Sequence, residues 1–114
     1  MNLPSRLPWI AIFAITLAGA AAAARPDCRG AHQLFMQTCS MCHGANGAGY
    51  PTIHTPNFTD PKWQARHTDA ELIAAVTHGK QGAGRMPAFQ GQLTPKQIDA
   101  LVRCVVRGYG KSHK

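Results

Sequence analysis

The chain has 114 residues and a formal net charge of +7, from 12 Lys and Arg against 5 Asp and Glu. This length has room for one domain. The basic residues are scattered, without a basic run or interleaved aromatic residues, so the pattern excludes a typical nucleic-acid-binding surface. The positive charge instead favours attraction to an acidic protein partner.

The first 24 residues have the pattern of an export signal. Arg6 precedes an apolar run over 7–17, and small residues follow up to Ala24. A basic start, an apolar centre and an Ala-x-Ala end characterise a secretory signal peptide. We therefore expect residues 1–24 to be cleaved near Ala24, residues 25–114 to form one domain, and the protein to be periplasmic. An uncleaved leader that anchors the protein in a membrane is the alternative.

The first predicted helix covers about 28–39, with Asp27 as its N-cap and apolar residues at helical spacing. Its end leads into a segment over 44–61 that is rich in glycine, proline and asparagine. Such a composition indicates a loop, and no alternating strand pattern interrupts it.

The second predicted helix has clear signals at both ends. A capping box from Thr68 to Glu71 begins it, and Gly79 stops it after His78. A second glycine-rich loop follows over 79–91.

The third helix begins at Thr94, with Pro95 at its first position and Gln97 completing another capping box, and is expected to end before Gly108. Three main helices joined by long loops make an all-α domain. With about 90 residues after the leader, such a domain would be under-packed unless a bound group fills its centre.

The sequence indicates that this group is a haem. Cys-x-x-Cys-His is the pattern of covalent haem attachment, and the chain has it at Cys39-Ser40-Met41-Cys42-His43. Its two thiols form thioethers with the haem vinyl groups, and the adjacent imidazole binds the iron. A redox-active dithiol and half of a zinc site are the alternatives. The dithiol would require an α/β context and the zinc site a second ligand pair, neither of which the sequence shows.

An electron-transferring iron held by His43 needs a second axial ligand. Met86 is the best candidate, because it lies in the loop after the second helix and Pro87 stiffens the segment that presents it. We expect Met36 to pack in the core and Met41 to be directed away from the iron. Three histidines are alternative ligands, with His78 the nearest rival: His54, His67 and His78.

Four short motifs accompany these residues. They are Leu34-Phe35 before Cys39; Cys42-His43-Gly44 leading into Asn46-Gly47-Ala48-Gly49; Thr55-Pro56-Asn57-Phe58-Thr59-Asp60 followed by Trp63; and Met86-Pro87-Ala88-Phe89 before the last helix. From about Ala31 to Tyr109 the chain thus resembles a short bacterial class I cytochrome c. The resemblance implies a small cytochrome c fold, with Phe35 and Leu101 at the crossing of the first and last helices.

The resemblance also implies two further residues at the haem. It places a proline carbonyl on the outer nitrogen of the axial histidine, and Pro56 matches that position better than Pro51. Such a bond would orient the ring of His43 and strengthen it as a donor. Trp63 resembles the family tryptophan near a haem propionate, with a simple core tryptophan as the alternative.

Two cysteines remain outside the haem motif. Cys104 stands three residues after Leu101, where the family usually has an aromatic residue, and Cys28 opens the first helix. Because these helices cross in the resembled fold and export leads to an oxidising compartment, we expect a Cys28–Cys104 disulfide. Two separate buried thiols are the alternative.

These observations predict a monomeric electron carrier with one haem c, bound through Cys39 and Cys42 and ligated by His43 and Met86. Its partners would be redox proteins with acidic docking surfaces, a donor dehydrogenase or an acceptor oxidase, and it would not itself be an enzyme. Membrane contact would arise only through a partner or an uncleaved leader. The alternatives are a haem subunit or module of a dehydrogenase or oxidase complex, and a peroxidase-like or gas-binding haem protein.

Overall fold

The computed structural model describes residues 2, 4, 19 and 24–111. The predicted signal peptide over 1–24 therefore lies almost entirely outside the described residues. In the part of the chain that the structure describes, no helix has both the length and the apolar character needed to cross a bilayer.

The first helical segment is longer than predicted. It consists of α1 (Cys28–Leu34), a π-helical stretch η1 (Phe35–Cys39) and α2 (Ser40–His43), which follow one another without a break. Asp27 caps it as expected, because its carboxylate accepts the N–H of Gly30. The segment ends at Gly44, whose φ of 77° is readily adopted only by glycine. The whole Cys-x-x-Cys-His motif is consequently held on helical backbone.

The second predicted helix is confirmed as α4 (Asp69–His78). Thr68 and Glu71 form the reciprocal capping box, and Gly79 follows the last turn with a φ of 73°. Both boundaries therefore agree with the sequence signals.

The C-terminal helical segment begins where predicted and ends later. It consists of α5 (Pro95–Ala100), the π-helical η3 (Leu101–Val106) and α6 (Arg107–Lys111). The expected stop at Gly108 is wrong, because a glycine inside a helix costs only about 1 kcal/mol. Packing of the next residue, Tyr109, against the rest of the fold keeps the chain helical beyond it.

A fourth main helix, α3 (Pro61–Arg66), was not expected. It lies at the end of the first long loop, after a short 3₁₀ turn, η2 (Pro51–Ile53). Asp60 caps it by accepting the N–H of Lys62. The all-α fold class is confirmed, since the described residues contain no strand and only two isolated bridges, Lys80 with Met86 and Gln90 with Leu93.

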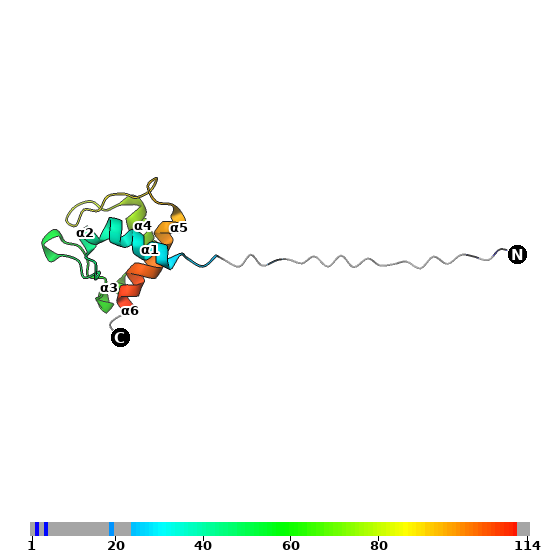
Figure 1. Cartoon of the computed structure of the whole chain (residues 1–114), viewed down its shortest axis with the longest axis horizontal. Helices are drawn as coiled ribbons and strands as arrows, with labels where there is room; N and C mark the ends of the chain where they lie inside the picture. The colour runs from blue at the N-terminus through cyan, green and yellow to red at the C-terminus, as the bar shows by residue number, and fades with distance from the viewer. Residues whose placement is uncertain (1, 3, 5–18, 20–23, 112–114) are drawn as a thin grey trace.

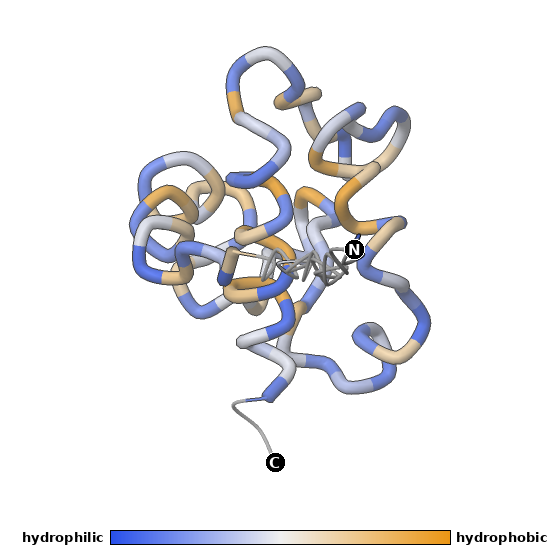
Figure 2. Tube along the Cα trace, turned by 90° about the vertical axis from the view of Figure 1, so that its right-hand side faces the viewer, coloured by the Kyte–Doolittle hydropathy of each residue, from blue (hydrophilic) through white to orange (hydrophobic). Residues whose placement is uncertain are grey.

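The core lies where α1 crosses α5 and η3 of the C-terminal helical segment (Figure 1). Phe35 and Leu101, expected at this crossing, belong to one buried cluster. Along the tube of Figure 2, hydrophobic and hydrophilic stretches alternate on the helical turns, as expected for helices with one buried face. The cluster's other buried members are Ala31, Phe58, Leu72, Ala100, Val102, Val105 and Val106.

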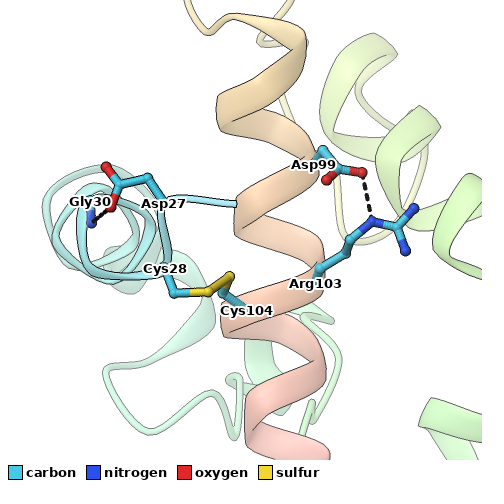
Figure 3. Close-up of a disulfide and its surroundings, with 6 residues drawn as sticks. All are labelled: Asp27, Cys28, Gly30, Asp99, Arg103 and Cys104. Carbon is cyan, nitrogen blue, oxygen red and sulfur yellow. Dashed lines mark hydrogen bonds and ion pairs between the residues drawn. A yellow bond between two sulfur atoms is a disulfide. The ribbon is translucent and has the colours of Figure 1, made fainter. Parts of the chain in front are cut away.

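A disulfide joins the two crossing segments. Cys28, at the start of α1, is bonded to Cys104 on η3, and their Cα atoms are 5.3 Å apart (Figure 3). This separation lies within the range of about 4.4–6.8 Å that a disulfide requires. The bond links residues 76 positions apart in the chain.

Arg107, on α6, connects this helix to α3 and to the start of α4. Its Nε donates to Asp69 Oδ1 at 2.7 Å, its Nη1 to Gln64 Oε1 at 2.7 Å, and its Nη2 to the carbonyl of His67 at 2.6 Å. Gln64 in turn donates to the carbonyls of Phe58 and Val106. The network therefore fixes α3 and the start of α4 against α6.

Candidate haem-binding site

One cavity of about 600 Å³ lies beside the helix crossing. Its walls come from η1 and α2, from the loop before α3, from α4, from the loop after α4 and from η3. The volume falls within the range of about 300–1,000 Å³ typical of ligand sites. All six site residues predicted from the sequence line this cavity: Cys39, Cys42, His43, Pro56, Trp63 and Met86.

His43 occupies the last position of α2, and its imidazole packs among aromatic rings. The ring of Phe58 is stacked on it with centroids 4.8 Å apart, and that of Phe35 lies 6.5 Å away. Burial lowers the pKa of His43, because desolvation disfavours the charged imidazolium. The ring is therefore neutral at pH 7, which is the form that binds a metal.

The Nδ1 atom of His43 is buried and has no hydrogen-bond partner within the described residues. The bond expected from the Pro56 carbonyl is thus not formed in this structure, although Pro56 lines the same cavity. Gly49 is close to the backbone of both residues, since its N–H donates to the carbonyl of His43 and a Cβ on it would clash with the carbonyl oxygen of Pro56. A buried imidazole nitrogen without a partner is destabilising, and a hydrogen bond to the carbonyl of Pro56 would remove this cost.

The thiols of Cys39 and Cys42 are free. Burial, together with the nearby Cys42 thiol, raises the pKa of Cys39 to about 11. Redox-active dithiols have a lowered thiol pKa, so this pair does not resemble one. Nor do the described residues contain a group of three or more His, Cys, Asp or Glu side chains that could hold a zinc ion. Both alternatives to haem attachment thus lack support.

Met86 is held by backbone bonds on both sides of the loop that carries it. Its N–H and carbonyl exchange hydrogen bonds with Lys80 at 3.0 and 2.9 Å, and Phe89 donates to the carbonyl of Val76 on α4. The expectation that Met36 packs in the core is wrong, because it is 50% exposed. Met41 is 87% exposed, and neither methionine lines the cavity.

The alternative histidine ligands are placed differently from expectation. His54 and His67 line the cavity, whereas His78 is exposed and does not. The view of His78 as the nearest rival is therefore wrong, since the last turn of α4 directs it to solvent. His54 lies outside α-helix, at a φ of 58°, and the ring of His67 lies against Trp63 with centroids 4.7 Å apart.

Sequence reasoning did not assign a role at the site to Phe58, although it sits two residues after Pro56. It also missed the charged residues of the cavity lining, which are Glu71, Lys80 and Arg85. The remainder of the wall is mainly apolar, with side chains from α4 and η3 such as Leu72, Val76, Val102 and Val106.

A haem fits this arrangement of residues. The apolar wall suits the porphyrin ring, the two thiols suit its vinyl groups, and a neutral imidazole and a thioether come from different elements of the same cavity.

Comparisons with known proteins agree with this site. Residues 26–103 match the family model described as cytochrome c oxidase, cbb3-type, subunit III. The cbb3-type cytochrome c oxidase subunit FixP of Bradyrhizobium sp. (strain ORS 278) is 34% identical over 98 residues, which are 86% of this chain and 33% of FixP. The chain thus spans about a third of the length of this curated relative.

Two shorter proteins match over most of their length. Cytochrome c6 of Nostoc sp. (strain PCC 7120) is 30% identical over 97 residues, covering 85% of this chain and 83% of that protein. The solved structure of the KustC0563 c-type cytochrome superposes with a TM-score of 0.64 at 33% identity, covering 71% of this chain and 98% of that one.

Proposed function

This chain belongs to the monohaem class I cytochromes c, carries covalently bound haem c and functions in electron transfer, and we propose that it does so as a soluble, monomeric carrier in the periplasm. The observation that carries the haem-binding part of this proposal is that the six residues predicted from the sequence line one cavity. The proposal includes export through the leader over 1–24 and its cleavage near Ala24.

We assign a role to each of these residues. Cys39 and Cys42 would anchor the haem by thioethers, and His43 and Met86 would be the ligands of its iron. The bound haem supplies one-electron chemistry between ferric and ferrous iron. The burial of the His43 imidazole and the backbone hydrogen bonds between Met86 and Lys80 would keep both ligands in place, so that electron transfer would require little reorganisation.

Pro56 and Trp63 support the site in this proposal. The carbonyl of Pro56 would accept a hydrogen bond from Nδ1 of His43 and so orient the ring. Trp63 packs on Phe58, with centroids 5.1 Å apart, and its cavity position suits contact with a haem propionate.

The partner we propose is a redox protein with an acidic docking surface. All five acidic residues have internal partners: Asp27, Asp60 and Glu71 cap helices, and Asp69 and Asp99 pair with arginines. Over residues 24–111, cations without such pairing remain exposed, among them Lys80 and Arg85 at the cavity. The free surface charge is therefore positive, which favours an acidic donor dehydrogenase or acceptor oxidase.

The main alternative is a haem module within a larger oxidase complex, which the match to FixP supports. We favour the carrier because cytochrome c6 is matched over most of its own length. Gel filtration and co-purification from the native host separate the two. A complex that survives purification supports the module, and a free small protein supports the carrier.

The second alternative is a gas-binding or peroxidase-like haem protein. A peroxidase needs a free acid-base pair beside the iron. The carboxylate of Glu71, the acidic side chain in the cavity lining, already accepts the N–H of Thr68 in the capping box. Addition of carbon monoxide to the ferrous protein should leave its absorption spectrum unchanged, and a carbon monoxide spectrum would favour this alternative.

The carrier function is tested on purified holoprotein. Acid-acetone extraction should leave the colour on the protein, and a potentiometric titration should follow a reversible one-electron curve. Colour in the solvent, or a titration that requires two electrons, would contradict the proposal.

A further inference from the structure

The turn that follows the Cys-x-x-Cys-His segment is held by a residue from the opposite end of the domain. The hydroxyl of Tyr109, on α6, donates a hydrogen bond to the carbonyl oxygen of Ala45 at 2.7 Å. Ala45 lies two residues after His43, and the two bonded residues are 64 positions apart. The bond therefore ties the backbone next to His43 to the C-terminal helix.

The ring of Tyr109 also covers this turn. A Cβ added to Gly47 would lie 2.5 Å from Cδ2 of the Tyr109 ring, so only glycine leaves room for it. Gly47 also has a φ of 71°, which favours glycine independently. The carbonyl of Gly47 accepts the N–H of Phe58 at 2.8 Å. The turn is thus bonded directly to Phe58, the residue whose ring stacks on His43.

The same ring reaches both aromatic neighbours of the imidazole. Its centroid lies 5.5 Å from that of Phe35 and 6.4 Å from that of Phe58. These are the two rings found next to His43. Tyr109 therefore contacts the surroundings of His43 by two routes, through the backbone turn and through the aromatic rings.

The hydroxyl of Tyr109 is suited to act as a permanent donor. Its pKa is raised, mainly because burial disfavours the phenolate. The group is thus protonated at neutral pH, and the hydrogen bond to Ala45 persists.

We propose that Tyr109 is a positioning residue for His43, which fixes the turn after the haem motif and thereby the orientation of the imidazole plane. The proposal rests on the proposed function, in which His43 is an axial ligand. Outer contacts of this kind orient ligands and tune the metal that they bind. Loss of the hydroxyl should therefore change the electronic structure of the haem and not only the stability of the fold.

The test uses the holoprotein with Tyr109→Phe, which retains the ring and removes the hydroxyl. The shifts of the haem methyl protons in the ferric protein report the orientation of the axial imidazole. We expect these shifts to move in Tyr109→Phe. The variant loses the hydrogen bond from Tyr109 to Ala45, which holds the turn to which the amide of Phe58 is bonded. That amide should therefore exchange about fivefold faster with solvent, as loss of one hydrogen bond implies.

Two variants serve as controls. Tyr50→Phe removes the hydroxyl of an exposed tyrosine, and Ile98→Val weakens the core at a buried position of α5 outside the cavity lining. Both should leave the methyl shifts unchanged. Unchanged shifts in Tyr109→Phe, or equal changes in Ile98→Val, would overturn the proposal.

The outcome is separable from a failure of the proposed function. His43→Ala tests ligation directly, because it should abolish the six-coordinate low-spin spectrum. If that spectrum survives in His43→Ala, the ligand assignment is wrong. If it is lost while Tyr109→Phe has wild-type shifts, only the positioning role is wrong.

Discussion

The phenyl ring of Phe58 is stacked on the imidazole of His43, with centroids 4.8 Å apart and planes inclined by 21°. Phe58 is buried, and its ring also contacts Trp63 and Tyr109. The side chain of Phe58, in the loop before α3, thus contacts His43 at the end of the haem motif, Trp63 on α3 and Tyr109 on α6.

Replacing Phe58 with Ala should destabilise the protein strongly. The change removes a buried ring from the core and leaves a cavity beside His43, for which about 3–5 kcal/mol is typical. Urea unfolding of the holoprotein measures the loss. A decrease below about 1 kcal/mol would mean that the ring contributes little, and Ile53→Ala at an exposed site provides the control.

The disulfide between Cys28 and Cys104 should contribute a large part of the stability. It closes a loop across a sequence separation of 76 residues, for which the chain-entropy model gives about 4 kcal/mol. We expect the double variant Cys28→Ser/Cys104→Ser to unfold at a markedly lower urea concentration than the wild type.

Alkylation without reductant provides the direct check of this bond. Mass spectrometry of the unfolded protein should find neither Cys28 nor Cys104 modified. Modification of both would show two separate thiols, which is the alternative that the sequence left open.

Arg107 and Arg103 both pair with Asp69, and we expect them to contribute unequally to the stability of the fold. The side chain of Arg107 is 20% exposed and reaches Gln64 and His67 as well, whereas that of Arg103 is 49% exposed. Arg107→Ala leaves several partly buried acceptors without partners and should cost about 2 kcal/mol. Arg103→Ala should cost much less, because exposed ion pairs contribute little. Equal losses in thermal unfolding would contradict this ranking.

The positive surface should make electron transfer to anionic reagents sensitive to salt. After removal of the leader, in which only Arg6 is charged, 11 basic and 5 acidic residues leave a net charge of +6. Exposed charges are screened over about 8 Å at physiological ionic strength. Oxidation by ferricyanide should therefore slow as salt is added, and oxidation by a cationic cobalt complex should accelerate. A rate independent of salt in both cases would argue against electrostatic docking.

The sequence was sufficient for those features that have local signals. The capping boxes at Thr68 and Thr94 placed two helix starts correctly, because each box satisfies backbone donors within four residues. The haem motif and Met86 likewise identified residues that the fold brings to one cavity.

Other features depend on contacts between distant segments and escaped prediction. The helix continues through Gly108 because Tyr109 packs against Phe35 and the turn at Gly47, which no local rule reveals. The helix α3 did carry a local signal, Asp60 followed by proline at the first helical position, but the surrounding loop composition obscured it. The sequence does not show that His78 is exposed to solvent and lies outside the cavity lining, because this depends on how α4 packs in the fold.

The assignment of Met86 as an axial ligand is tested most directly by the near-infrared spectrum of the ferric protein. A weak sulfur-to-iron band should be present in the wild type and absent from Met86→Ala, whose potential should also be lower because methionine favours ferrous iron. Met41→Ala, at an exposed position outside the cavity, should retain the band. Survival of the band in Met86→Ala would contradict the account of the site.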